Sequence, residues 1–147
     1  MTTSEVRILH VTIRVPIERA YAFARRPENF PRWAVGLADS LRLTERGWIA
    51  DTPEGEALIH FSEANALGVL DHRVIIDGRP DVVVPMRMVP NGDGTEVELI
   101  LFRQSGMSEA DFKRDARAVK TDLEALKVLL EAEPDDRRSG RMLANGT

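Results

Sequence analysis

The chain of 147 residues contains no cysteine, which excludes thiol catalysis, disulfide bridges and zinc sites with cysteine ligands. Aromatic residues make up only 5% of the chain, too few for a protein that reads single strands by stacking bases. No stretch approaches the roughly 18 apolar residues that cross a bilayer. Positive charge is not in excess either, because the net charge is −4. We therefore predict neither nucleic-acid binding nor stable membrane insertion.

What remains is the composition of an ordinary soluble globular protein, with 43% hydrophobic and 30% charged residues. The length suits one domain with a sizeable core and is short for two. We predict a single domain over residues 1–133 and a disordered tail over 134–147, which has too few apolar residues to offset the cost of ordering. The first residues show no basic start followed by an apolar stretch, so a cytoplasmic location is expected.

The first forty residues predict one strand and two short helices. Residues 6–15 alternate between apolar and polar side chains, as in a strand with one buried face. Pro16 suits the first turn of a helix, where its missing N–H costs nothing. The helix is predicted over 17–25 and ends before Pro27, and a second helix of a turn or two is predicted around Trp33.

From Ser40 onward, turn sequences separate short runs rich in Val, Ile, Leu and Met. Asn91-Gly92-Asp93-Gly94 is one such turn. Short runs with tight turns favour an antiparallel meander over parallel crossover units. The predicted strands are 40–46, 48–52, 56–63, 69–77, 82–90 and 95–103.

The last element has the clearest pattern. Ser108 and Asp111 form a capping box in which Asp replaces the usual Glu. Apolar residues then recur at steps of four and three along one face of a helix of about six turns. A coiled coil would show the same steps, but no second helix of comparable length is predicted, so a sheet is the expected partner. The apolar positions are Phe112, Ala116, Val119, Leu123, Leu126 and Leu130.

This order of elements predicts an α+β fold. A curved antiparallel sheet of about seven strands would wrap the long C-terminal helix in its concave face, with the two short helices closing one end. A curved sheet and a straight helix do not fill the same volume, so a ligand cavity is expected between them.

Three segments carry a family resemblance: Val15-Pro16-Ile17-Glu18-Arg19-Ala20-Tyr21, Arg26-Pro27-Glu28-Asn29-Phe30-Pro31-Arg32-Trp33 and the run 84–97. These segments and the order of elements resemble the helix-grip fold of the START-related superfamily, also called SRPBCC. The third segment is similar to the late hairpin of bacterial members of the polyketide cyclase/dehydrase type, and the resemblance covers residues 6–131. It implies a START- or pollen-allergen-like fold, which hosts hydrophobic carriers, lipid-transfer domains and enzymes alike.

His72 is the histidine whose pattern best suits chemistry in such a cavity. It alternates with Leu70 and Val74, so its imidazole is expected to face inward, where it would hydrogen-bond a ligand carbonyl or act as a base. The alternative is a core histidine bonded to a neighbouring backbone group. A single β-bulge would turn Asp71 and Arg73 inward instead.

The other chemical signals are weaker. His10 lies on a polar face and is expected to be solvated, whereas the face of His60 is ambiguous. A metal pair of His60 and His72 lacks a recognised close spacing, so neither a metal site nor a cofactor is predicted. The chain shows no nucleophile beside its base and no nucleotide-binding loop.

We expect a small-molecule-binding protein that holds an apolar or amphipathic ligand (lipid-, polyketide- or isoprenoid-like) in the cavity between sheet and terminal helix. The second hypothesis, which the resemblance permits, is a polyketide cyclase or dehydratase with His72 as acid/base. A second polar group beside His72, from Ser62, His60 or Arg87, would favour it. The third is an interaction module with a filled core, such as a homodimer through an exposed sheet edge. The expected lining residues are Trp33, Phe61, Leu70, His72, Val74, Met86, Met88, Leu99, Val119 and Leu123.

Overall fold

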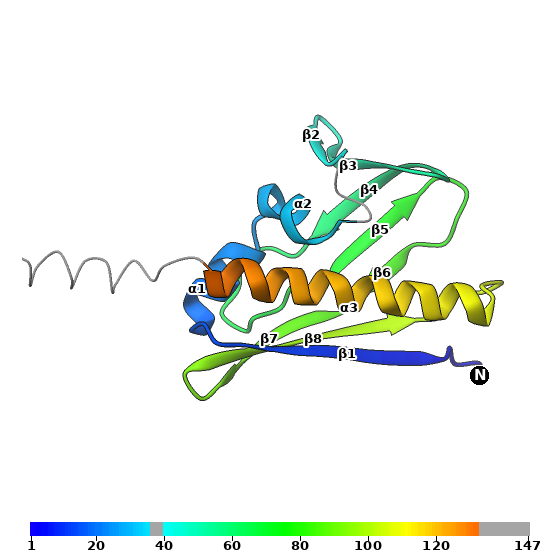
Figure 1. Ribbon diagram of the computed structural model, residues 1–147. Helices are drawn as coiled ribbons and strands as arrows, with labels where there is room; N and C mark the ends of the chain where they lie inside the picture. The colour runs from blue at the N-terminus through cyan, green and yellow to red at the C-terminus, as the bar shows by residue number, and fades with distance from the viewer. Residues whose placement is uncertain (36–39, 133–147) are drawn as a thin grey trace, which may run out of the picture.

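The computed structural model describes residues 1–35 and 40–132, so the predicted tail at 134–147 lies outside the described residues. Strands and helices follow one another in the predicted order (Figure 1). They are β1 (Val6–Ile13), α1 (Ile17–Ala24), the 3-10 turn η1 (Pro27–Asn29), α2 (Phe30–Trp33), β2 (Arg42–Thr44), β3 (Gly47–Thr52), β4 (Gly55–Phe61), β5 (His72–Ile76), β6 (Val82–Val84), β7 (Met86–Asn91), β8 (Gly94–Phe102) and α3 (Glu109–Ala132).

The strands form two antiparallel sheets, with the orders β1-β8-β7 and β2-β3-β4-β5-β6. In Figure 1 the first sheet runs beneath α3 and the second rises above it. The α+β class and the antiparallel pairing are confirmed. The prediction had a single sheet, whereas the strands of the structure are divided between two. The break between the two sheets lies at Pro85, so the single strand predicted over 82–90 was wrong. Proline has no N–H to give to a ladder, and β6 on one side pairs with β5 whereas β7 on the other side pairs with β8.

Backbone hydrogen bonds connect the two sheets across this break. The Leu70 N–H donates to the Met86 carbonyl, and the Met88 N–H donates to the Gly68 carbonyl, each at 2.8 Å. Gly68 has φ +70°, and a Cβ added there would lie 2.0 Å from the Met88 oxygen. Only glycine allows the chain before β5 to approach β7 this closely.

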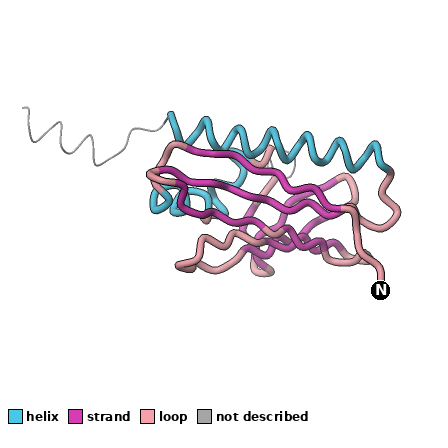
Figure 2. Tube along the Cα trace, turned by 90° about the horizontal axis from the view of Figure 1, so that it is seen from below, coloured by secondary structure: helices cyan, strands magenta, loops and turns pink. Residues whose placement is uncertain are grey.

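Helix α3 packs along β1 of the three-stranded sheet (Figure 2). Its N-terminus is capped by the Ser108 hydroxyl, which accepts the Asp111 N–H at 3.1 Å, and the Asp111 carboxylate lies 2.9 Å from Arg114. The predicted apolar face is confirmed, with Val119 partly buried and the other positions fully buried. The buried positions are Phe112, Ala116, Leu123, Leu126 and Leu130.

The apolar core has two parts. The larger cluster joins α3 and the three-stranded sheet to α1 and α2. The smaller one lies on β3 and β4 around Ala50, Ala57 and Ile59. The larger cluster continues into the helices that follow β1, so these helices are fixed against the sheet by burial of apolar surface.

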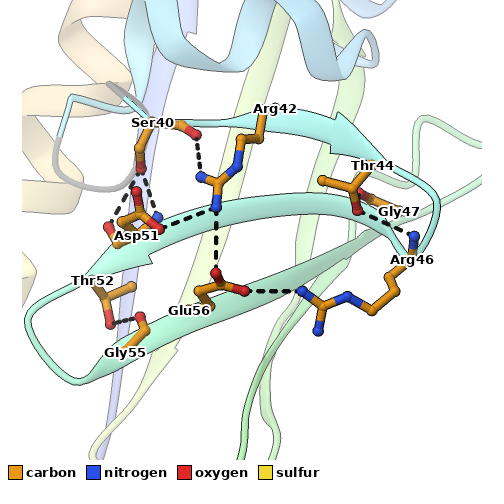
Figure 3. A network of polar contacts seen from close by, with 9 residues as sticks. All are labelled: Ser40, Arg42, Thr44, Arg46, Gly47, Asp51, Thr52, Gly55 and Glu56. Carbon is orange, nitrogen blue, oxygen red and sulfur yellow. Dashed lines mark hydrogen bonds and ion pairs between the residues drawn. The ribbon is translucent and has the colours of Figure 1, made fainter.

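The edge of the five-stranded sheet carries a polar network (Figure 3). Arg42 lies 3.3 Å from Asp51 and 3.5 Å from Glu56, and Arg46 lies 3.0 Å from Glu56. The Ser40 hydroxyl accepts the Asp51 N–H at 2.6 Å. These exposed ion pairs contribute little stability each, but their charges make a short edge strand a poor template for pairing with another chain.

Candidate functional site

A small cavity lies where α1 and α2 meet the ends of β4, β5 and β7. Its volume is about 10 Å³, room for about one water molecule. The lining is mostly apolar and aromatic, and α3 contributes none of it. The nine lining residues are Ala24, Arg25, Phe30, Trp33, Phe61, Ser62, Leu70, His72 and Met86.

Phe30 lies at the centre of an aromatic cluster in the cavity wall. Its ring packs edge-on against the rings of Trp33, Phe61 and His72, with centroid separations of 5.1, 5.3 and 5.7 Å. Residues three apart share one side of a helix, so the single turn of α2 turns Phe30 and Trp33 to the same side. Phe61 and His72 are register partners on β4 and β5 and therefore share a face of the sheet.

His72 faces the cavity, as its alternation predicts. Nδ1 lies 3.3 Å from the Leu70 carbonyl oxygen, which can only accept a hydrogen bond, so the ring proton is placed on Nδ1 and Nε2 is left as an acceptor. Burial lowers the pKa of His72 below its ordinary value, although the Leu70 carbonyl acts in the opposite direction. The imidazole is therefore neutral at pH 7. The alternative prediction, a core histidine bonded to a neighbouring backbone group, correctly describes the bond to Leu70. The His72 ring nevertheless lines the cavity.

Trp33 is the residue with an unmet hydrogen bond in this wall. Only 4% of it is exposed, and its indole N–H has no acceptor among residues 1–35 and 40–132. A buried donor without a partner costs about 1–3 kcal/mol. Native proteins rarely leave such a group unpaired, and it commonly marks a place for water or a ligand.

The polar groups expected beside His72 are engaged or point elsewhere. Ser62 lines the cavity, but both its hydroxyl and its N–H donate to the Asp71 carbonyl. His60 and Arg87 are exposed. The Asp71 carboxylate accepts the Met86 N–H at 2.8 Å. The lining also contains the exposed Arg25, so the buried polar group that accompanies His72 there is the Trp33 indole.

The loop between β4 and β5 closes the same end of the fold. The Tyr21 hydroxyl accepts the Asn65 N–H at 2.9 Å. The Asn65 side chain in turn accepts the N–H groups of Leu67 and Val69 and donates to the Val69 carbonyl, at 3.0–3.1 Å. Sequence reasoning missed both Tyr21 and Asn65. The available signal was Asn65 itself, because an asparagine side chain often hydrogen-bonds the backbone two residues further along the chain and so indicates a turn.

Of the ten residues predicted to line the cavity, five do so: Trp33, Phe61, Leu70, His72 and Met86. The prediction missed four lining residues: Ala24, Arg25, Phe30 and Ser62. The other five predicted positions pack elsewhere: Met88, Leu99 and Leu123 are buried in the larger core cluster, Val119 packs against that cluster, and Val74 packs against the smaller one. The predicted residues would have extended the cavity along the terminal helix. The cavity in the structure lies at the end of the fold that α1 and α2 close.

Within residues 1–35 and 40–132, no group of three or more His, Asp or Glu side chains is arranged to hold a metal ion. No helix in the same part of the chain combines the length and the apolar character needed to span a membrane.

The fold, by contrast, is found in solved structures, although neither a family model nor a curated protein matches the chain. Ara h 8.0201 superposes with a TM-score of 0.64 at 11% identity, covering 88% of this chain and 99% of its own. CalU16 from Micromonospora echinospora has a TM-score of 0.62 at 20% identity, with 90% and 78% covered. DynU16, a protein in the dynemicin biosynthetic locus, has a TM-score of 0.64 at 15% identity, with 86% and 47% covered. The chain therefore has the helix-grip fold.

Proposed function

We propose that the protein binds a small apolar or amphipathic molecule at the cavity between α1, α2 and the ends of β4, β5 and β7. The observation that supports this proposal is the lining: aromatic and aliphatic side chains around a few polar groups, the composition typical of small-molecule sites. Burial of apolar surface, worth about 25 cal/mol per Å² before the cost of association, would supply most of the affinity.

Entry of a ligand requires the wall to open, because the cavity of about 10 Å³ holds about one water. The parts able to separate are α1 and the loop 62–71, which line the cavity and meet through the hydrogen bond between Tyr21 and Asn65. Movement of the loop alone would widen the cavity and keep the hydrogen bond that Arg19 of α1 donates to the Leu130 carbonyl of α3. Loops that admit ligands commonly come from the less stable parts of a fold.

The lining favours binding over acid–base catalysis. A cyclase-type mechanism would need a second group that exchanges protons beside His72. The Trp33 indole N–H is a donor only, and the Ser62 hydroxyl already donates to a carbonyl. The neutral imidazole and the indole are suited to orienting a ligand.

The test is native mass spectrometry of the freshly purified protein, combined with fluorescence titration of the dye 1-anilinonaphthalene-8-sulfonate. Ala24 lines the cavity and is 8% exposed, so Ala24→Leu would fill the space. Ala22, on the same helix, is exposed, and Ala22→Leu is the matched control. We expect a co-purifying adduct, or one equivalent of dye, that Ala24→Leu weakens about tenfold or more while Ala22→Leu does not.

Equal dye binding by both variants would contradict the proposed site. A mass of two chains without an adduct would favour the interaction module. The small volume of the cavity is the observation that makes this module the second candidate, because its core would be filled.

A further inference from the structure

One residue of the cavity lining carries a buried hydrogen-bond donor that has no partner within residues 1–35 and 40–132. This donor is the Trp33 indole N–H. An apolar ligand would leave this donor unpaired. A ligand with an acceptor oxygen would remove the cost of burying it.

The same cavity presents one acceptor. With its proton on Nδ1 and directed to the Leu70 carbonyl, His72 carries a lone pair on Nε2. His72 and Trp33 pack against the ring of Phe30, with centroids 5.7 and 5.1 Å away. Both residues also line a cavity of about one water's volume, so both border the space that one polar group of a ligand would occupy.

We propose that the ligand carries a hydroxyl group, as in an apolar alcohol or a phenol. Its oxygen accepts the hydrogen bond from Trp33 Nε1–H, and its proton is donated to Nε2 of His72. This inference rests on the proposed function and specifies the ligand chemistry of the same site. A ketone or an ether satisfies only the donor, and a hydrocarbon satisfies neither. Sites built to bond a hydroxyl discriminate strongly against analogues that lack it.

A carboxylate is the competing head group, since Arg25 also lines the cavity and is exposed at its rim. A carboxylate offers only acceptor oxygens, which would face the lone pair on His72 Nε2. The exposed guanidinium would give a weak, salt-screened attraction in return. The arrangement of the two rings therefore favours a neutral hydroxyl.

The experiment compares four naphthalenes of similar shape on the full chain at pH 7: 2-naphthol, 2-methylnaphthalene, 2-methoxynaphthalene and 2-naphthoate. Calorimetry gives the affinities, and the indole N–H signals in proton–nitrogen correlation spectra give a direct readout. The chain has two tryptophans, and the signal lost in Trp33→Phe identifies Trp33. We expect 2-naphthol to bind about tenfold more tightly than 2-methylnaphthalene and to shift the Trp33 indole signal.

The variants separate the two hydrogen bonds. Trp33→Phe should reduce the preference for 2-naphthol over 2-methylnaphthalene to less than about threefold. His72→Phe should remove the preference for 2-naphthol over 2-methoxynaphthalene. Trp48→Phe, at a position outside the lining, is the control and should retain both preferences. The Trp33 signal of the unmodified protein still decides the question if a variant fails to fold.

Three outcomes overturn the inference. Equal affinity for 2-naphthol and 2-methylnaphthalene, with both weakened by Ala24→Leu, would refute the hydroxyl and leave the proposed function standing. Tightest binding of 2-naphthoate would assign recognition to Arg25. If no naphthalene and no dye binds, and no adduct co-purifies, the proposed function fails and the inference fails with it.

Discussion

The hydroxyl of Tyr21 on α1 accepts a hydrogen bond from the backbone N–H of Asn65, 44 positions further along the chain, at 2.9 Å. This bond links the two segments that close the end of the cavity. The side-chain amide of Asn65 hydrogen-bonds backbone groups of Leu67 and Val69 and so fixes the local turn. Tyr21 therefore connects the helices that follow β1 to the loop before β5.

Replacement of Tyr21 by Phe tests this link. Phe keeps the ring and removes the acceptor, so the partly buried N–H of Asn65 loses its partner. We expect a loss of about 1 kcal/mol in the free energy of unfolding. Amide hydrogen exchange should accelerate over residues 62–70 and stay unchanged in α3. Equal exchange rates over residues 62–70 in the variant and in the unmodified protein would show that the bond does not hold the loop.

Gly68→Ala tests the close approach between the loop and β7. The added Cβ would meet the Met88 carbonyl oxygen at 2.0 Å, in a conformation with φ +70°. We expect destabilisation of about 3 kcal/mol or more, because both backbone segments must move. Gly78→Ala is the matched control: φ is +79°, but nothing lies within 4 Å of the added Cβ, so it should cost only about 1–2 kcal/mol. Equal costs in urea unfolding would refute the close contact.

Thr95 is the buried polar side chain of the described core, with 0% exposed, and its hydroxyl donates to the Val15 carbonyl at 2.7 Å. Thr95→Val keeps the shape and leaves that carbonyl without its side-chain donor. We expect a loss of about 1–2 kcal/mol in the free energy of unfolding. Thr121→Val on the exposed face of α3 also removes a hydroxyl bonded to a carbonyl, and it should cost less because water can replace the bond.

Asp122 makes stability depend on pH. Burial raises the pKa of Asp122 to about 6, against the effect of the Val35 N–H, which donates to its carboxylate. Because the folded-state pKa exceeds the unfolded value of 3.8, this group's contribution to stability is complete below about pH 4 and is lost as the pH rises through 6.

Asp122→Asn, which cannot ionise, should therefore stabilise the fold at pH 8 by about 1 kcal/mol, a figure discounted for partial exposure. It should have little effect near pH 4. Thermal unfolding at the two pH values measures the difference. Glu124→Gln, at an exposed position of the same helix, is the control and should show no such dependence. A stabilisation equal at both pH values would contradict a raised pKa.

Sequence patterns predicted elements whose signals are local. The apolar stripe from Phe112 to Leu130 predicted the buried face of α3, because side-chain direction repeats every 3.6 residues in a helix. Alternation likewise placed His72 on the inner face of β5. The break at Pro85 was missed because the alternation of Val84 and Met86 continues across it. Alternation identifies a face of a strand and not the strand with which it pairs.

The sequence by itself determined the order of elements and the inward face of His72, since these follow from periodicity and turn chemistry. The helix-grip fold came from the resemblance of its segments to a known family. Tertiary structure alone decided where the cavity lies, because Phe30, Phe61 and His72 meet only when α2 docks on β4 and β5. It also decided that the Trp33 indole has no acceptor among the residues that the structure describes. Whether a buried donor is paired depends on every group packed around it, and those groups come from segments far apart in the chain.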